Sequence, residues 1–340
     1  MGTAEAVSGL ELKVLDITND AEVRAAAELT YENWGKIIKY ERRGGKSKRL
    51  ESIAGQLRAR SEKFRDGQIV AYYEGKLVGI INANRLSINS WQEIPKTWKA
   101  ATGNYVFDNY DSNGNVLVCP NVSVNLTEEY SKRNIGSHLI NAVRELALKI
   151  NRDNVNSGHQ DIEAIMPYSR FRHYKATKEA VKEGKTLVVN INGKYYVLDE
   201  SHLKDEELRR KLSKQGVAVL PIKEFTPQNY IFFRRFKDLA SAEQEEAVDV
   251  PYDDVPRFHS RLGGVPIGIE KKKFDLLISG LGYGGRPADK ESGGHNPILL
   301  YDLTRKKIMF DRLVSPDHNG HFSKAKDGIG RGLYKYNRTA

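Results

Sequence analysis

The stretch Asn121-Val-Ser-Val-Asn-Leu-Thr-Glu-Glu-Tyr-Ser-Lys-Arg-Asn-Ile-Gly-Ser-His-Leu-Ile140 decides the fold that we expect. It begins as an apolar β-strand, continues as a short polar segment, and then shows helical spacing of apolar residues as far as Ile150. The start of a helix leaves backbone N–H groups unpaired and carries positive partial charge, which suits phosphate. Lys132 and Arg133 add formal charge there. The stretch therefore predicts a phosphate site, although ordinary strand–helix turns share this pattern.

The same stretch resembles the GNAT superfamily of N-acetyltransferases. Members of that superfamily have an apolar strand, a short polar segment, and then Gln/Arg-x-x-Gly-x-Gly/Ala at the start of a helix. With Tyr130 at the common aromatic position, Ser131 stands at the Gln/Arg position, Asn134 at the first Gly and Gly136 at the last. Asn tolerates the left-handed backbone that the first Gly adopts. In place of Ser131, Arg133 could contact a pyrophosphate.

The resemblance implies that this segment binds an acyl-CoA, with acetyl-CoA as the expected donor. In the family, the strand before the loop separates from its neighbour, and its backbone runs along the pantetheine. The cofactor-binding residues implied are Val122, Ser123, Val124, Ser131, Lys132, Arg133, Asn134, Ile135, Gly136 and Ser137.

The order of predicted elements indicates an α/β (α+β) chain. The family implies a central, mostly antiparallel mixed sheet that is flanked by helices. Helices are predicted over 21–34, 50–64 and 134–150, and strands over 68–73, 77–83, 115–124 and 161–166. Glu74-Gly75-Lys76 predicts a hairpin turn, and Gly79 on the second strand is similarly typical of the family.

A second resemblance lies downstream, in Arg257-Phe-His-Ser-Arg-Leu-Gly-Gly264. Family members end their core with a helix whose Tyr often protonates the departing thiolate, and His259 stands at that position. The stretch is similar to a bacterial branch with Phe-His-x-x-x-Gly at this place. The resemblance makes His259 a candidate catalytic acid; packing of the histidine in the core, or contact with the cofactor alone, are the alternatives. His138 is expected to be a surface residue.

About 80 residues separate the last core strand from this late helix, which is too long for a structureless loop. We therefore predict a GNAT core at 10–167 and 250–303, an inserted acceptor-side lobe at 168–249, and a basic C-terminal extension at 304–340. Within the lobe we expect a hairpin over 186–199 and a helix over 204–215. Acceptor pockets of the family open after the last core strand, which makes Tyr168, Arg170 and Tyr174 site candidates, with Tyr168 and Tyr174 as further catalytic candidates.

The chain has 340 residues and a formal net charge of +10, and the charge is concentrated in two stretches. Residues 36–49 carry seven bases and one acid, and residues 304–340 carry nine bases and three acids. Such stretches are either solvated loops or contacts to an anionic partner such as a phosphorylated cofactor, an acyl carrier protein or a tRNA. A single cysteine and no apolar run of about 20 residues favour a cytoplasmic protein without a membrane span.

Several other features predict no chemistry. Cys119 lies within a strand and is expected to be a buried, inert thiol rather than a nucleophile. The glycine-rich run 280–285 precedes Arg286-Pro287 instead of a helix, so we interpret it as a flexible turn. His295, His318 and His321 lack a matching ligand set, so no metal site is predicted.

The sequence thus predicts an N-acyltransferase that moves an acyl group from acyl-CoA to an amine by direct attack in a ternary complex. Three acidic residues stand near predicted strand ends as candidates for the general base, namely Asp108, Asp111 and Glu163. The alternative donors are aminoacyl-tRNA and acyl carrier protein, since the phosphate loop departs from the family's pattern. The third alternative is a catalytically silent scaffold of the same fold.

Overall fold

The computed structural model describes residues 8–35, 45–95, 97–131, 133–155, 157–169, 171–192, 194–226, 230–231, 233–243, 251–266, 277–279 and 295–304. The chain divides into two compact units. Unit 1 comprises Met1–Tyr168, Ile278–Asp289 and Leu300–Leu313, and unit 2 comprises Ser169–Leu277, Lys290–Leu299 and Val314–Ala340.

Unit 1 alternates helices and strands in its first half. Its elements are β1 (Leu10–Val14), α1 (Asp20–Thr30), a π-helical turn (Tyr31–Gly35), α2 (Gly45–Lys63), a 3-10 turn (Arg65–Gly67), β2 (Gln68–Tyr73), β3 (Lys76–Leu86), a 3-10 turn (Trp91–Glu93), α3 (Trp98–Ala101), an irregular turn (Gly103–Phe107), β4 (Val116–Val124), α4 (Glu128–Ser131), α5 (Ile135–Asn154) and β5 (Ala164–Pro167). Strand β13 (Leu299–Asp302) adds the last neighbour of β5, and β11 (Leu277–Ser279) also ends in this unit.

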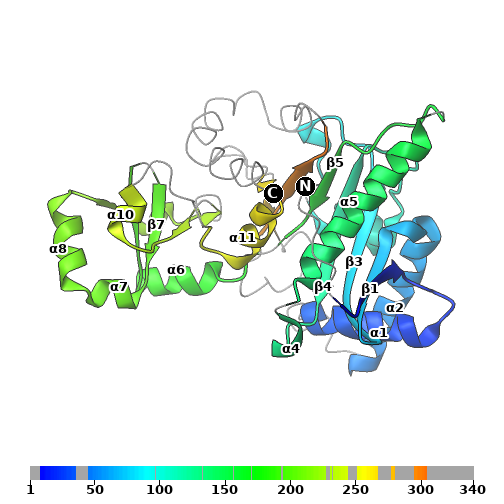
Figure 1. Cartoon of the computed structure of the whole chain (residues 1–340), viewed down its shortest axis with the longest axis horizontal. Coiled ribbons are helices and arrows are strands. Elements are labelled where there is room, and N and C mark those ends of the chain that lie inside the picture. The colour runs from blue at the N-terminus through cyan, green and yellow to red at the C-terminus, as the bar shows by residue number, and fades with distance from the viewer. Residues whose placement is uncertain are drawn as a thin grey trace. The chain divides into compact units, whose positions relative to one another are not determined.

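The strands of unit 1 follow the order β1-β2-β3-β4-β5-β13 in one sheet (Figure 1). Only β4 and β5 pair in parallel, whereas the other neighbours pair antiparallel. This mixed and mostly antiparallel sheet with flanking helices confirms the predicted fold class.

Helices cover both faces of this sheet, as two neighbouring residues of β3 show. A Cβ atom on Gly79 would stand 2.8 Å from Cγ2 of Ile135 and 3.0 Å from Cδ1 of Leu139, so this face lies directly under α5. Ile80 instead belongs to a buried cluster with Ala26 of α1 and Leu57 of α2. Because successive side chains of a strand point to opposite faces, α5 lies on one face and α1 with α2 on the other.

Most predicted elements of unit 1 are confirmed, with differences at their ends. The hairpin turn has positive φ at Glu74 (49°) and Gly75 (77°), which suits the right-handed twist of the two strands. Helix α2 begins at Gly45, five residues before the predicted start. Strand β1 was not predicted, although apolar and charged residues alternate from Leu10 to Val14, and the segment Trp98–Phe107 was not predicted because it carries no clear apolar period.

Unit 2 contains the predicted hairpin, a helix on each side of it and the late helix. Its elements are α6 (Tyr174–Lys182), β6 (Leu187–Ile191), β7 (Lys194–Leu198), α7 (Glu200–Lys204), α8 (Glu206–Lys214), β8 (Ala218–Val219), a 3-10 turn (Ile222–Glu224), β9 (Arg234–Arg235), α10 (Leu239–Glu243), α11 (Asp254–Arg261), β10 (Val265–Pro266) and β12 (His295–Pro297). The predicted helix over 204–215 corresponds to α8, which begins at Glu206 after its N-cap Asp205, and the short helix α7 before it was not predicted.

The four-stranded sheet β8-β6-β7-β9 has a hydrophobic core on each face. Val188 and Val197 pack with Phe171, Tyr174 and other aromatic residues on one face. On the other face Val189, Tyr196 and Leu198 pack with Leu208 of α8 and with Phe236. A sheet that buries both faces forms a small folded unit of its own.

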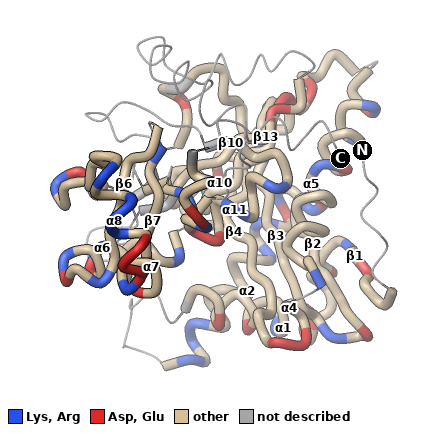
Figure 2. Tube along the Cα trace, turned by 60° about the vertical axis from the view of Figure 1, so that its left-hand side comes forward, with Lys and Arg blue, Asp and Glu red and all other residues tan. Residues whose placement is uncertain are grey.

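The two predicted basic stretches contribute little to the described surface. Residues 36–44 and 305–340 lie outside the described residues, so only residues 45–49 and Thr304 can be placed. Along the helices of unit 2, Lys and Arg are interspersed with Asp and Glu (Figure 2). Ion pairs join Lys182 to Glu179, Lys204 to Glu200 and Lys211 to Glu207. The exposed faces of these helices therefore carry positive and negative side chains that pair with each other along the same helix.

Candidate functional site

The parallel pairing of β4 with β5 stops halfway along β4. Val116 to Cys119 pair with Ala164 to Pro167, while β4 continues to Val124 and pairs there only with β3. Pro120, the next residue, has no N–H group to donate to a neighbouring strand. The second half of β4 therefore has one sheet neighbour instead of two, which is the separation that the family resemblance implied for Val122–Val124.

Asn134 forms the turn between this strand and α5. Its backbone is left-handed, with φ 52° and ψ 29°, and its carbonyl oxygen accepts hydrogen bonds from the N–H groups of Ser137 and His138. The left-handed backbone expected of Asn134 is thus present, while its place in the family motif stays a prediction. Its side chain makes no capping hydrogen bond, and among the described residues nothing accepts from the N–H groups of Ile135 and Gly136. Among the described residues, the N–H groups of these two residues at the start of a 20-residue helix therefore have no acceptor.

Aromatic contacts fix the charged part of this turn. The guanidinium of Arg133 lies 4.8 Å from the ring centre of Tyr73, and the ring of Tyr130 packs edge-on against Tyr73 at 6.0 Å. Arg133 is exposed beside the helix start, where its charge adds to that of the helix end. Lys132 and the side chain of Ser131 lie outside the described residues.

The three predicted residues of β4 differ in their surroundings. Ser123 is buried, and its hydroxyl donates to Oδ1 of Asn121 and accepts from Nε1 of Trp34, both at 2.9 Å. Val122 and Val124 are half-buried, and the carbonyl oxygen of Val124 accepts from Nδ2 of Asn33 at 3.2 Å. The side chain of Ser123 is therefore committed to the interior of unit 1.

His259 lies on α11 in unit 2, where its Nε2 atom is 2.6 Å from Oγ of Ser169. Both side chains are buried. Burial lowers the pKa of His259 to about 3, so the imidazole is neutral at pH 7. A neutral imidazole has one N–H group and one acceptor nitrogen, and the predicted role of His259 as the acid that protonates the thiolate stays a prediction. A buried hydroxyl at hydrogen-bond distance from an imidazole is an arrangement that can orient or transfer a proton.

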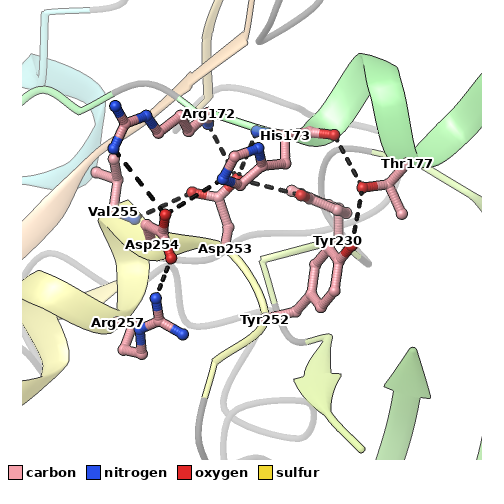
Figure 3. A network of polar contacts seen from close by, with 9 residues as sticks. All are labelled: Arg172, His173, Thr177, Tyr230, Tyr252, Asp253, Asp254, Val255 and Arg257. Atoms are coloured by element: carbon pink, nitrogen blue, oxygen red, sulfur yellow. Dashed lines mark hydrogen bonds and ion pairs between the residues drawn. The ribbon is translucent and has the colours of Figure 1, made fainter. Parts of the chain in front are cut away.

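Asp253 ties the start of α11 to the segment that follows Ser169 (Figure 3). Its Oδ2 atom accepts from the N–H groups of Arg172 and His173 at 2.9 and 3.0 Å and from the hydroxyl of Tyr230 at 3.1 Å. Its Oδ1 atom caps the helix through the N–H of Val255. This buried carboxylate joins α11 to the segment after Ser169 within unit 2.

The other two predicted catalytic residues are held by backbone carbonyl groups. Tyr168 is buried in unit 1, where its hydroxyl donates to the carbonyl oxygen of Pro95 at 2.9 Å, and burial raises its pKa. Tyr174 belongs to the aromatic core of unit 2, with its hydroxyl 3.3 Å from the carbonyl oxygen of Phe225, and burial raises its pKa to about 12. Arg170 lies outside the described residues. The structure therefore groups Tyr174 with the lobe's core and His259 with Ser169.

The remaining residues are those for which the sequence predicts no chemistry. Cys119 is fully buried, and burial raises its pKa, as expected of an inert thiol. His138 is half-buried on α5. The glycine-rich run 280–285, His318 and His321 lie outside the described residues, as does the side chain of His295. Among the residues that the structure describes, no group of three or more His, Cys, Asp or Glu could hold a metal ion. None of the described helices has the length and hydropathy of a membrane span.

Sequence reasoning missed Ser169 and the buried polar residues of the sheet. Ser169 was inside the segment singled out as the acceptor side, and a hydroxyl directly after a buried strand was the available signal. Asn82 and Asn84 on β3, and Asn121 and Ser123 on β4, recur at a spacing of two among apolar neighbours. Polar residues on the buried face of a strand indicate a hydrogen-bonded network, which pattern analysis could have flagged.

Neither a protein-family model nor a curated protein matches the chain. Among solved structures, it is similar to the loading GNATL domain of CurA from Lyngbya majuscula, with 16% identity, a TM-score of 0.47, and coverage of 86% of this chain and 97% of that one. It is also similar to the GphF GNAT-like decarboxylase in complex with isobutyryl-CoA, with 16% identity, a TM-score of 0.46, and coverage of 86% and 100%. An N-acetyltransferase from Staphylococcus aureus Mu50 covers 54% of this chain and 96% of its own, with 14% identity and a TM-score of 0.30.

Every TM-score is below 0.5, so no activity, substrate or partner of these proteins is transferred to this chain.

Proposed function

We propose that this chain is a cytoplasmic N-acyltransferase that binds acyl-CoA along the second half of β4 and at the start of α5. The observation that supports this most is the end of the β4–β5 pairing at Cys119 and Pro167, while β4 continues to Val124 and leads to the start of α5. A strand half without a second neighbour offers backbone N–H and C=O groups to an extended pantetheine. The N–H groups of Ile135 and Gly136, which have no acceptor among the described residues, and Arg133 beside them would offer donors and charge to a pyrophosphate.

In the proposed reaction an amine nitrogen attacks the carbonyl carbon of the thioester, and the carbon–sulfur bond then breaks. The nitrogen loses one proton and the departing thiolate gains one, so the products are an amide and the free thiol of CoA. Backbone N–H groups near Val122–Val124 would polarise the carbonyl, which is where negative charge develops. Acetyl-CoA is the first donor to test. The acceptor is proposed only as an amine.

For the proton transfer we propose the pair of Ser169 and His259. A neutral imidazole that donates to Oγ of Ser169 would orient the hydroxyl as a hydrogen-bond donor to a developing thiolate, and the proton that the thiolate finally gains would be the one that the amine loses. If this is its role, Ser169→Ala and His259→Ala should each lower kcat by roughly 10²–10⁴, the usual contribution of a positioned proton donor or acceptor. Turnover is to be divided by the folded fraction taken from a melting curve. A rate per folded molecule within a factor of two of wild type would remove the pair from the mechanism.

The donor site is tested by calorimetry with CoA and acetyl-CoA. We expect saturable binding that Gly136→Trp and Arg133→Glu weaken, since these residues stand at the start of α5. Arg152→Glu is the matched control, because Arg152 is exposed near the other end of the same helix. Equal affinity in all variants would overturn the site assignment. If neither wild type nor any variant binds CoA or acetyl-CoA, a carrier protein or an aminoacyl-tRNA is favoured as the donor. RNA that co-purifies and absorbs at 260 nm would then point to aminoacyl-tRNA.

A further inference from the structure

Arg60 of α2 is a buried cation in unit 1, with 3% of its surface exposed. Its Nε atom donates to the carbonyl oxygen of Tyr105 at 2.8 Å, Nη1 to Oδ1 of Asn82 at 3.2 Å and Nη2 to Oε1 of Gln56 at 3.4 Å. All three acceptors are neutral, and no ion pair found among the described residues includes Arg60. Burial lowers its pKa to about 10, so it remains charged at pH 7.

A buried arginine of this kind is expected to lower the stability of the core that it fills. A buried charge without an opposite charge is destabilising relative to an apolar residue of similar size, even when its hydrogen bonds are made. Stability alone would therefore be served better by Met at this position. An arginine is favoured at this position only if its guanidinium keeps the groups that it contacts in place.

The first of these contacts leads from Arg60 to β4. Oδ1 of Asn82 accepts from Arg60 and also from Nδ2 of Asn121, at 2.9 Å. Oδ1 of Asn121 accepts from the hydroxyl of Ser123, and Oγ of Ser123 accepts from Nε1 of Trp34. This chain of hydrogen bonds runs from α2 through β3 to the half of β4 that β5 does not support.

The groups at the ends of this hydrogen-bond network allow only one orientation of the side-chain amides within it. Arg60 only donates, so the oxygen of Asn82 must face it, and the amide nitrogen of Asn82 then faces Oε1 of Gln68 at 2.9 Å. The amide nitrogen of Gln68 in turn meets the carbonyl oxygens of Phe64 and Ala83. On the other branch Asn121 must turn its oxygen toward Ser123, because the indole of Trp34 also only donates.

The second contact holds a strained segment. Between Gly103 and Phe107, φ is positive at Gly103 (47°), Asn104 (55°), Tyr105 (78°) and Phe107 (62°), although three of these residues are not glycine. Backbone of this kind persists where its surroundings hold it. Arg60 binds the carbonyl oxygen of Tyr105 and lies 5.3 Å from the ring of Phe107 and 5.8 Å from the ring of Trp98. The indole of Trp98 donates to the carbonyl oxygen of Pro120, where β4 leaves β5.

We infer that Arg60 is a positioning residue, which fixes the Pro120–Val124 half of β4 through Asn82 and through the Trp98–Phe107 segment. This inference rests on the proposed function only for its catalytic consequence. The register shift between β3 and β4 falls between Asn82 and Asn84, beside these contacts. A bulge interrupts the regular pairing of β3 with β4, so the direction of β4 here depends on the groups that pack around it.

The test compares Arg60→Met and Arg60→Lys with Arg58→Met. Arg58 is a half-buried arginine on the same helix, whose Nη2 atom pairs with Asp20 at 2.6 Å. Hydrogen exchange of the Val122–Val124 amides is measured relative to the amides of α5. We expect Arg60→Met to speed exchange on β4 selectively, by about tenfold or more, and Arg58→Met to leave it unchanged. Uniform acceleration over both elements would overturn the inference, because it would mean global destabilisation.

A double-mutant cycle tests the route through Asn82. Asn82→Leu should reproduce the exchange pattern of Arg60→Met, and the double variant should be little worse than either single one, since both break the same chain. If the effects on β4 simply add, the two residues act separately and the route is wrong.

Activity gives the last readout. A shift of the strand by about 1 Å can cost on the order of 10²-fold in rate. We expect kcat of Arg60→Met to fall by roughly 10–100-fold per folded molecule, with partial recovery in Arg60→Lys, while the Kd for CoA changes by less than about threefold. An unchanged kcat beside a lowered Tm would make Arg60 a structural residue only. If no variant binds CoA, the proposed function fails, and the exchange experiment alone decides on Arg60.

Discussion

The Nε2 atom of His259 and the Oγ atom of Ser169 lie 2.6 Å apart, with both side chains inside unit 2. Ser169 is held from its other side, since its N–H donates to the carbonyl oxygen of Pro297 at 2.9 Å. The pair is thus fixed by a helix and by two segments of extended chain. Its dependence on pH follows from the burial of the imidazole.

Burial lowers the pKa of His259 to about 3, whereas the unfolded chain has the ordinary value near 6.5. Between these values the unfolded chain binds a proton that the folded chain excludes, so the free energy of unfolding falls as the pH is lowered. The full contribution is present above pH 6.5. From pH 7 to pH 5, wild type should lose about 2 kcal/mol more than His259→Gln, as measured by urea unfolding. Equal losses in the two proteins would mean that the imidazole is not buried as described.

The left-handed turn at Asn134 gives a second prediction. Its φ of 52° suits Gly and Asn, while most other residues, Ala included, lose about 1–2 kcal/mol in this left-handed conformation. Asn134→Ala should therefore lower the free energy of unfolding by about 1 kcal/mol, and Asn134→Gly should leave it unchanged or raise it slightly. Glu145→Ala, on the exposed face of the same helix, is the control. Equal stability of the Ala and Gly variants would contradict the left-handed assignment.

Two glycines of unit 1 should respond in opposite directions to the same substitution. Gly79→Ala places a Cβ 2.8 Å from Ile135 and 3.0 Å from Leu139, so it should destabilise the protein by about 1–3 kcal/mol. Gly55 is exposed on α2 with nothing within 4 Å of such a Cβ, so Gly55→Ala should stabilise the protein by up to about 1 kcal/mol. Thermal unfolding of both variants measures the difference. Destabilisation by Gly55→Ala, or none by Gly79→Ala, would show that α5 and α2 are not placed as described.

The sequence predicts the sheet and its helices well wherever apolar residues recur at a regular period. Strand β2 has the predicted bounds, and α5 begins one residue from its predicted start. The segment from Trp98 to Phe107 was not predicted, because its shape depends on Arg60 and on positive φ at bulky residues, which no local pattern specifies. The strand, turn and helix of the candidate donor site could be predicted, because the turn residue and the apolar period of the helix lie in one continuous stretch of sequence.

The candidate catalytic pair was predicted only in part. His259 was found through the family's late motif, whereas Ser169 lies 90 residues away in the sequence. Pairing over such a distance depends on how the lobe folds. A neutral imidazole near pH 7 was expected, whereas the lowering of its pKa to about 3 could not be predicted, because it depends on burial and burial is a property of the fold. The contact of α11 with the segment after Ser169 likewise involves a residue far away in the sequence, the buried Asp253.

The last prediction concerns that carboxylate. Asp253 accepts four hydrogen bonds, from the N–H groups of Arg172, His173 and Val255 and from the hydroxyl of Tyr230. In Asp253→Asn one of the two oxygens becomes an amide nitrogen, which faces at least one of these donors whichever way the side chain turns. The loss of an acceptor in a buried site costs roughly 1–3 kcal/mol, and more for a charged one. We expect Asp253→Asn to loosen α11 and the segment after Ser169 together, because both depend on the same carboxylate.

Limited proteolysis measures this effect within unit 2. In wild type, residues 171–226 should resist cleavage, since the sheet there is packed on both faces. Asp253→Asn should expose sites in 171–182 and around α11 at protease concentrations that leave wild type intact. Asp254→Asn is the matched control, because Asp254 is one-third exposed and its contacts to His173 and Arg257 are only partly buried. Such pairs contribute about 0–1 kcal/mol, so the control should be cleaved at nearly the wild-type rate. If both variants are cleaved alike, the hydrogen bonds of Asp253 do not hold α11 to the lobe, and some other contact must.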